Sequence, residues 1–178
     1  AGVGPEHVVN DPYSTVAVNV EGTQNVLELA RRYYPNAFTL LTSTSEVYGN
    51  CPDRPFREDT SPMVLGPSQE RRWCYAASKL SAEHLVLSRG GVVVRLFNTT
   101  GPGQSEQYVL PRFVGMALRG EDITLYGDGA QVRCFCHVKD TVAALVALLE
   151  RGGYLSGARQ RQVLNIGSDQ ETTIRALA

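Results

Sequence analysis

The sequence predicts an α/β fold in which helices alternate with the strands of a parallel sheet. Residues 14–34 and 72–88 carry apolar side chains at helical spacing. Residues 38–42 and 92–97 are short runs rich in apolar residues, as expected of strands buried on both faces of a sheet. Strands and helices that alternate in this way pair in parallel through right-handed crossovers. The first half of the chain is therefore predicted to form one sheet with helices packed against it.

Turn residues mark the ends of these elements. Ser14 follows an Asp-Pro turn and is expected to cap the first helix, which Pro35-Asn36 ends. Residues 50–71 contain several prolines and many charges, so a long surface loop is expected there. Gly90-Gly91 ends the second helix. The first half thus reads as helix, strand, loop, helix and strand.

The second half contains shorter elements. We expect helices over 110–118 and over 140–149 (the latter capped by Asp140), strands over 123–126, 134–138 and 163–166, and a last helix opened by Thr172 or Thr173. We interpret 1–98 as part of the sheet domain and 99–178 as a smaller α/β substrate-binding lobe interleaved with it. Residues 163–167 are candidates to return to the sheet of the first domain.

Composition excludes several classes of function. Hydrophobic residues make up 43% of the chain, charged residues 20%, and the net charge is -1, so neither nucleic acid nor an anionic membrane is expected as a partner. No apolar run approaches the roughly 20 residues of a membrane span, and no signal sequence is recognised at the start, so a cytoplasmic protein is expected. The four cysteines (Cys51, Cys74, Cys134 and Cys136) form no C-x-x-C pair, so reduced thiols and no metal site are predicted.

The most informative residues point to proton transfer. Tyr75 and Lys79 are four residues apart, so they lie on one face of a helix. An ammonium group near a phenol favours the phenolate and lowers the phenol's pKa, which makes the tyrosine a usable base. Thr44 and Asn98 each follow a predicted strand, and parallel sheets bind ligands beyond the carboxyl ends of their strands. The sequence therefore predicts a site at this edge, where Thr44 and Tyr75 share a substrate oxygen.

Further motifs occur in order along the chain. They are Asn19-Val20-Glu21-Gly22-Thr23, Thr44-Ser45-Glu46-Val47-Tyr48-Gly49, Arg95-Leu96-Phe97-Asn98-x-x-Gly101-Pro102 and Gly127-Asp128-Gly129-Ala130-Gln131-Val132-Arg133-Cys134-Phe135. With them the chain resembles the extended short-chain dehydrogenase/reductases that act on nucleotide sugars, the NAD-dependent epimerase/dehydratase group. This resemblance covers essentially all 178 residues. It implies a Rossmann-like, doubly wound parallel sheet, NAD as cofactor, and a homodimer formed by helices 14–34 and 72–88.

The resemblance also implies roles for individual residues. The expected catalytic residues are Thr44, Ser45, Glu46, Tyr75 and Lys79. Cofactor binding is expected from Thr42, Ser43, Tyr75, Lys79 and Phe97, and substrate binding from Asn98, Arg133, Thr44 and Glu46. Asn19 is expected to support Lys79 through the helix backbone, and Arg95 to be structural, at the rim of a strand.

One family feature has no counterpart. The glycine-rich phosphate loop G-x-x-G-x-x-G, which binds adenosine and pyrophosphate at a helix N-terminus, does not occur in this sequence. Ala1-Gly2-Val3-Gly4 resembles instead the tail of the family's fourth strand, so we expect a fragment without the N-terminal strands.

Three functions remain open at this point. Thr44-Ser45-Glu46 favours a reaction like that of UDP-glucuronate decarboxylases, because a carboxylate beside the oxidised sugar can act as an acid or base. A UDP-sugar 4-epimerase is the alternative within the family. The missing phosphate loop motivates a third hypothesis, a non-catalytic nucleotide-binding relative.

Overall fold

The computed structural model describes residues 4–151 and 163–178, and the chain forms two compact units. The first unit comprises Ala1–Leu96 and Val146–Asn165, and the second comprises Phe97–Leu145 and Ile166–Ala178. The assignment of a substrate-binding role to the second unit stays a prediction.

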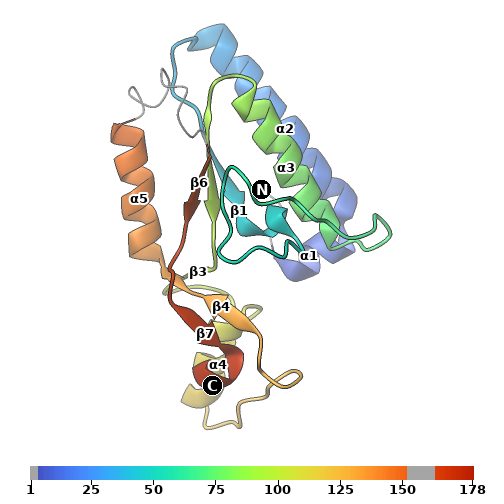
Figure 1. Cartoon of the computed structure of the whole chain (residues 1–178), viewed down its shortest axis with the longest axis vertical. Coiled ribbons are helices and arrows are strands. Elements are labelled where there is room, and N and C mark those ends of the chain that lie inside the picture. Colours follow the sequence, from blue (N-terminus) through green and yellow to red (C-terminus); the bar gives the residue numbers. More distant parts are fainter. Residues whose placement is uncertain (1–3, 152–162) are drawn as a thin grey trace. The chain divides into compact units, whose positions relative to one another are not determined.

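The first unit is an α/β layer structure, as predicted. Its elements are α1 (Pro5–Asn10), α2 (Pro12–Tyr33), β1 (Leu40–Thr44), the 3-10 helix η1 (Ser45–Tyr48), α3 (Trp73–Leu87), β2 (Val92–Leu96) and β6 (Val163–Ile166). The strands form one sheet in the order β1-β2-β6, and β1 and β2 are parallel, with Leu40 opposite Val92 and Thr44 opposite Leu96. Helices α2 and α3 lie side by side (Figure 1), and α3 packs on both β1 and β2.

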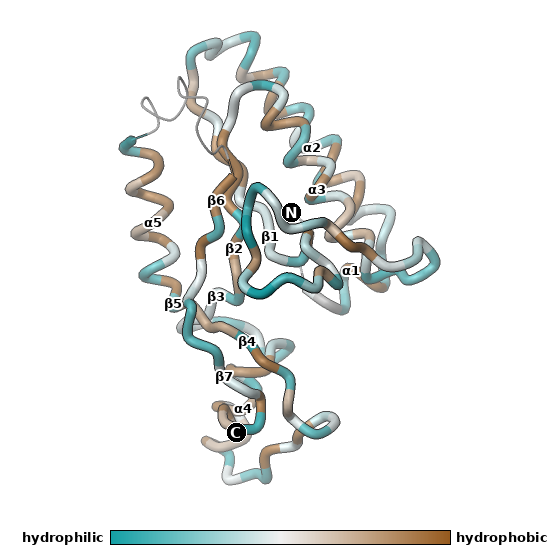
Figure 2. The backbone as a smooth tube through the Cα atoms, viewed as in Figure 1, coloured by the Kyte–Doolittle hydropathy of each residue, from teal (hydrophilic) through white to brown (hydrophobic). Residues whose placement is uncertain are grey.

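The first unit's core explains why these segments fold as they do. Val93 on β2 is fully buried and packs with Leu27 of α2 and Val86 of α3. Hydrophobic and hydrophilic residues are mixed along α2 and α3 in Figure 2, and the buried residues of α2 (Thr15, Asn19 and Leu27) recur at multiples of four, on one side of the helix. The prediction that Ser14 caps α2 is wrong. The Asp11 side chain accepts a hydrogen bond from the Ser14 backbone N–H at 3.0 Å, because the cap must precede Pro12 at the first helical position.

The second unit contains short pairs of strands and two helices of its own. β3 (Thr99–Thr100) pairs in parallel with β5 (Cys136–His137), and β4 (Val132–Cys134) pairs antiparallel with β7 (Glu171–Thr173). The helices are α4 (Val109–Leu118) and α7 (Ile174–Leu177), which Thr173 caps as predicted. The helix α5 (Val138–Glu150) begins in this unit and ends in the first.

Three local predictions for the second unit are wrong. No strand forms over 123–126, because a short apolar run becomes a strand only beside a partner, and none of the described strands pairs with it. The strand expected over 134–138 is divided at Phe135, because β4 pairs with β7 while β5 pairs with β3. Helix α5 then begins at Val138, so Asp140 lies in its first turn instead of capping it.

Over residues 4–151 and 163–178, no helix has both the length and the apolar character that a membrane span requires. The four cysteines are free thiols. Within the same ranges, no three His, Cys, Asp or Glu side chains gather as a metal site would require.

Candidate functional site

The carboxyl end of β1 leads directly into the 3-10 helix that carries Glu46. Thr44, the last residue of the strand, is buried, and its Oγ1 accepts a hydrogen bond from the Glu46 backbone N–H at 3.2 Å. This contact is the helix cap that a strand-end threonine commonly provides. A hydroxyl that accepts one hydrogen bond keeps its own proton to donate, so Thr44 retains the donor that the predicted contact with a substrate oxygen requires. Ser45 is half-buried and Glu46 is exposed at the start of η1.

Lys79 is a buried residue of α3 and not a lysine on a solvated helix face. Its side chain is 6% exposed, and Nζ donates a hydrogen bond to the Thr42 carbonyl oxygen at 2.6 Å. Burial lowers the pKa of Lys79, and the negative charge of Glu83 raises it by a smaller amount. The structure therefore holds an ammonium group against the middle of β1, and the role of Lys79 in cofactor binding stays a prediction. Tyr75 lies one helical turn earlier and is half-buried.

Asn19 of α2 forms a side-chain hydrogen bond to helix α3. It is buried, and its Nδ2 donates to the Ser78 Oγ at 3.0 Å. Ser78 Oγ in turn donates to the carbonyl oxygen of Tyr75 at 2.9 Å. The contact therefore reaches α3 at Ser78 and Tyr75, and support of Lys79 by Asn19 through the helix backbone stays a prediction.

Beside this site lies a buried polar network. Glu83 and Arg95 form an ion pair at 2.7 Å in which both side chains are almost fully buried, and Arg95 Nε and Nη2 both donate to the carboxylate. Burial opposes the charge of Arg95, but the hydrogen bonds and charge of Glu83 outweigh it, so the pKa of Arg95 is raised. The prediction that Arg95 is structural is consistent with these contacts: Arg95 is the penultimate residue of β2, and it is buried. A guanidinium can be buried near the end of β2 because a carboxylate faces it from α3.

Ser43 joins this network as well. Its hydroxyl donates to Oε1 of Glu83. The side chain expected to bind cofactor is thus engaged in the core, and a role of Ser43 in cofactor binding stays a prediction. Thr42 is exposed, and its backbone carbonyl oxygen accepts the hydrogen bond from Lys79 Nζ.

The remaining predicted residues lie in the second unit. Asn98 Nδ2 donates to the Cys134 carbonyl oxygen at 3.3 Å. Arg133 is exposed on β4, and its Nη1 donates to the neighbouring Val132 carbonyl oxygen. Phe97 is half-buried and donates its backbone N–H to the Ile166 carbonyl oxygen. The roles of Asn98 and Arg133 in substrate binding and of Phe97 in cofactor binding stay predictions.

Sequence reasoning missed Glu83, although a signal was present. Tyr75, Lys79 and Glu83 follow one another at intervals of four residues, so all three lie on one face of α3. An acidic residue on the face that is buried against a sheet needs a basic partner. Arg95, the charged residue in an otherwise apolar strand, is that partner.

The comparison with protein families decides the identity of this arrangement. The model of the NAD dependent epimerase/dehydratase family matches residues 2–167. The chain belongs to this family. NAD is the cofactor of the family, as the resemblance in the sequence implied.

Named relatives refine this result. A UDP-N-acetyl-alpha-D-glucosaminuronate decarboxylase of Bacillus cytotoxicus is 34% identical over 184 residues, which cover 99% of this chain and 54% of the relative. UDP-glucuronic acid decarboxylase 1 of Arabidopsis thaliana is 43% identical over 154 residues, or 82% of this chain and 34% of the relative. The chain thus spans about half, or less, of the length of these curated relatives.

A solved structure agrees with the fold. The UDP-glucuronic acid 4-epimerase of Bacillus cereus, solved in complex with UDP-glucuronic acid and NAD, superposes with a TM-score of 0.72 at 28% identity. The match covers 90% of this chain and 49% of the epimerase chain. The predicted Rossmann-like α/β fold is therefore confirmed.

The residues around Lys79 fit the ribose of a nicotinamide nucleotide. An ammonium group has three N–H donors, and within the described part of the chain the Thr42 carbonyl oxygen accepts one of them. The remaining donors suit hydroxyl oxygens such as those of a ribose. Because the ammonium is buried, such hydrogen bonds would form in a medium of low dielectric constant, where they are strong.

Proposed function

We propose that the complete protein is an NAD-dependent enzyme that decarboxylates UDP-glucuronate or a close analogue through transient oxidation of sugar carbon 4. The observation that carries this proposal is the similarity to decarboxylases of UDP-glucuronic acid and of a related N-acetylated sugar acid, at 43% and 34% identity. Glu46, which directly follows Thr44-Ser45 at the strand end, supports the proposal, because its carboxyl group can act as an acid or base beside the sugar carbon that loses its carboxylate.

The first step would be the removal of a proton from the sugar's 4-hydroxyl. Tyr75 would accept this proton, while the Thr44 hydroxyl would donate a hydrogen bond to the same oxygen. Lys79 would hold the nicotinamide ribose and stabilise negative charge on the Tyr75 oxygen. The chemistry that NAD supplies when bound is transfer of a hydride from carbon 4 and back to it.

Loss of carbon dioxide would follow from the ketone at carbon 4. The bond between carbon 5 and the carboxylate breaks, and its electron pair is delocalised onto the oxygen at carbon 4. Carbon 5 then takes up a proton, which Glu46 would deliver. Tyr75 finally returns its proton to the oxygen at carbon 4 when the ketone is reduced. The exposed position of Glu46 at the head of η1 suits exchange of its proton with solvent.

The test is turnover by the complete protein. It is incubated with UDP-glucuronate, and carbon dioxide and the sugar nucleotides are measured. We expect carbon dioxide and a UDP-pentose in equal amounts, and a loss of at least about 100-fold in rate for Tyr75→Phe, in the range of general-base catalysis. Tyr13→Phe, which changes an exposed tyrosine at the start of α2, is the matched control.

Other products would contradict the proposal. UDP-galacturonate without carbon dioxide would identify a 4-epimerase, the activity of the structural relative from Bacillus cereus. If neither product forms and the denatured protein releases no NAD, the protein is a non-catalytic relative.

A further inference from the structure

Tyr48 ends the 3-10 helix that carries Glu46, and its side chain has no exposed surface. It follows Glu46 by two residues and Thr44 by four. A phenol so deeply buried cannot touch a substrate, and its hydroxyl costs free energy unless it is hydrogen-bonded. Any effect of Tyr48 on the proposed reaction must therefore act through other residues.

The hydroxyl of Tyr48 is held from two sides. It accepts a hydrogen bond from Arg95 Nη1 at 2.9 Å and donates one to Asn165 Oδ1 at 2.9 Å. The ring stacks on Phe56 with centroids 4.5 Å apart, and the Arg95 guanidinium carbon lies 4.8 Å from the ring centroid. Both hydrogen-bonding functions of the phenol are used and its ring is packed, so the side chain is confined to one place.

These contacts of Tyr48 with Arg95, Asn165 and Phe56 form a clamp, and on one side the clamp is anchored to helix α3 through Arg95. Arg95 is paired with Glu83, which lies on the same helical face as Tyr75 and Lys79. Glu83 also accepts the hydroxyl of Ser43, one residue before Thr44. The contacts of Arg95 and Glu83 therefore connect η1 to α3, the helix that carries the proposed base Tyr75.

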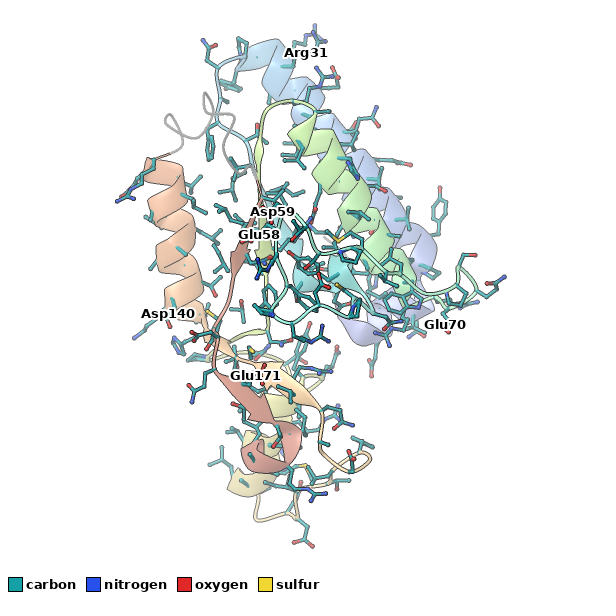
Figure 3. All side chains as sticks on the ribbon, in the orientation of Figure 1. Arg31, Glu58, Asp59, Glu70, Asp140 and Glu171 are labelled. Atoms are coloured by element: carbon teal, nitrogen blue, oxygen red, sulfur yellow. The ribbon has the colours of Figure 1, made fainter. Side chains whose placement is uncertain are left out.

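On the other side the clamp is anchored to β6 and to the long loop. Asn165 Nδ2 donates to the Phe56 carbonyl oxygen at 3.3 Å, and the Asn165 backbone N–H donates to Glu58 Oε1 at 2.9 Å. Glu58 lies beside β6 in Figure 3. The backbone carbonyl of Tyr48 accepts hydrogen bonds from the N–H groups of Cys51 and Val64, which closes the loop onto the end of η1.

We propose that Tyr48 is a positioning residue: its clamped hydroxyl fixes the 3-10 segment that bears Glu46 relative to helix α3. This inference rests on the proposed function in so far as Glu46 acts on the substrate. A misplacement of about 1 Å in a reacting group can cost about 100-fold in rate, so a clamp of this kind has a measurable effect.

The test is Tyr48→Phe in the complete protein, because this change removes the hydroxyl and keeps the packed ring. Values of kcat and KM for UDP-glucuronate are compared with wild type and with the Tyr13→Phe control. The same comparison is made in a Glu46→Gln background. We expect kcat to fall about 10-fold with KM within about twofold, and the further loss in the Glu46→Gln background to be less than about twofold, since residues that act through one another are not additive.

Hydrogen exchange provides a readout that needs no substrate. In Tyr48→Phe, the amides of residues 45–51 are expected to exchange at least about 10-fold faster, whereas those in the middle of α2 keep their wild-type rates. Unchanged exchange over 45–51 overturns the proposal. A kcat of Tyr48→Phe within twofold of wild type also overturns it. The same is true if Tyr48→Phe lowers kcat by the full 10-fold in the Glu46→Gln background. If wild type itself turns over no UDP-glucuronate, the proposed function fails, and faster exchange still supports the clamp.

Discussion

The buried ion pair between Glu83 and Arg95 makes a sharp prediction about stability. Arg95→Met leaves the Glu83 carboxylate 2% exposed with the Ser43 hydroxyl as its remaining hydrogen-bond donor, and it removes a donor from Tyr48. Removing one partner of a buried pair costs about 3–5 kcal/mol, because the other charge stays desolvated. A domain is stable by only about 5–15 kcal/mol, so this loss is a large fraction of the total.

Removing both charges should recover most of that loss. The double variant Glu83→Met/Arg95→Met leaves no buried charge, and replacing a whole buried pair by apolar residues is often neutral. We therefore expect its free energy of unfolding to lie within about 2 kcal/mol of wild type. Urea unfolding followed by circular dichroism measures the free energy of unfolding of wild type, Arg95→Met and the double variant. Arg31→Met is the control, since Arg31 pairs with Glu28 on the surface (Figure 3) and the change should not be resolved.

Two results would refute this reasoning. A cost below about 1 kcal/mol for Arg95→Met would mean that water reaches Glu83, as it reaches a surface pair. A double variant as unstable as the single one would mean that packing and the hydrogen bonds, not the unpaired charge, carry the effect.

Further predictions concern a charge, a cap and a helix contact. The lowered pKa of Lys79 means that the folded state binds fewer protons between that pKa and the ordinary 10.5, so the free energy of unfolding should rise with pH across this window. Lys79→Met should abolish that rise in urea titrations at several pH values, whereas the exposed Lys139→Met should keep it. Asp11→Ala should cost about 1 kcal/mol in the same assay, because it removes the cap of α2; an unchanged midpoint would contradict this. Asn19→Leu leaves the buried Ser78 hydroxyl without its donor and should cost about 1–3 kcal/mol, and a smaller loss in the Ser78→Ala background would confirm that the two side chains are coupled.

Much of the candidate site could be predicted from local patterns. Tyr75 and Lys79 share a helix face because their spacing matches one turn of α3. Thr44 was expected just past a strand, and it is the last residue of β1, where it also caps η1. These features depend on residues close in the sequence, so periodicity and turn chemistry suffice to find them.

The exact ends of several elements could not be predicted in the same way. Residues 123–126 have the composition of a strand but lack a described partner, and residues 134–138 divide at Phe135 because two different strands pair with their halves. A strand is stabilised by its neighbours, which the local sequence does not contain.

The sequence by itself determined which residue types stand at the helix face and at the strand end, because helical and strand periodicity fix the direction of each side chain. Only the tertiary structure decided that Ser43 turns to Glu83, that Arg95 is buried, and that Tyr48 is clamped by Asn165, 117 residues away. The physical reason is that a buried polar group is stable only with a partner. For these groups the partner is supplied by another element of the folded chain.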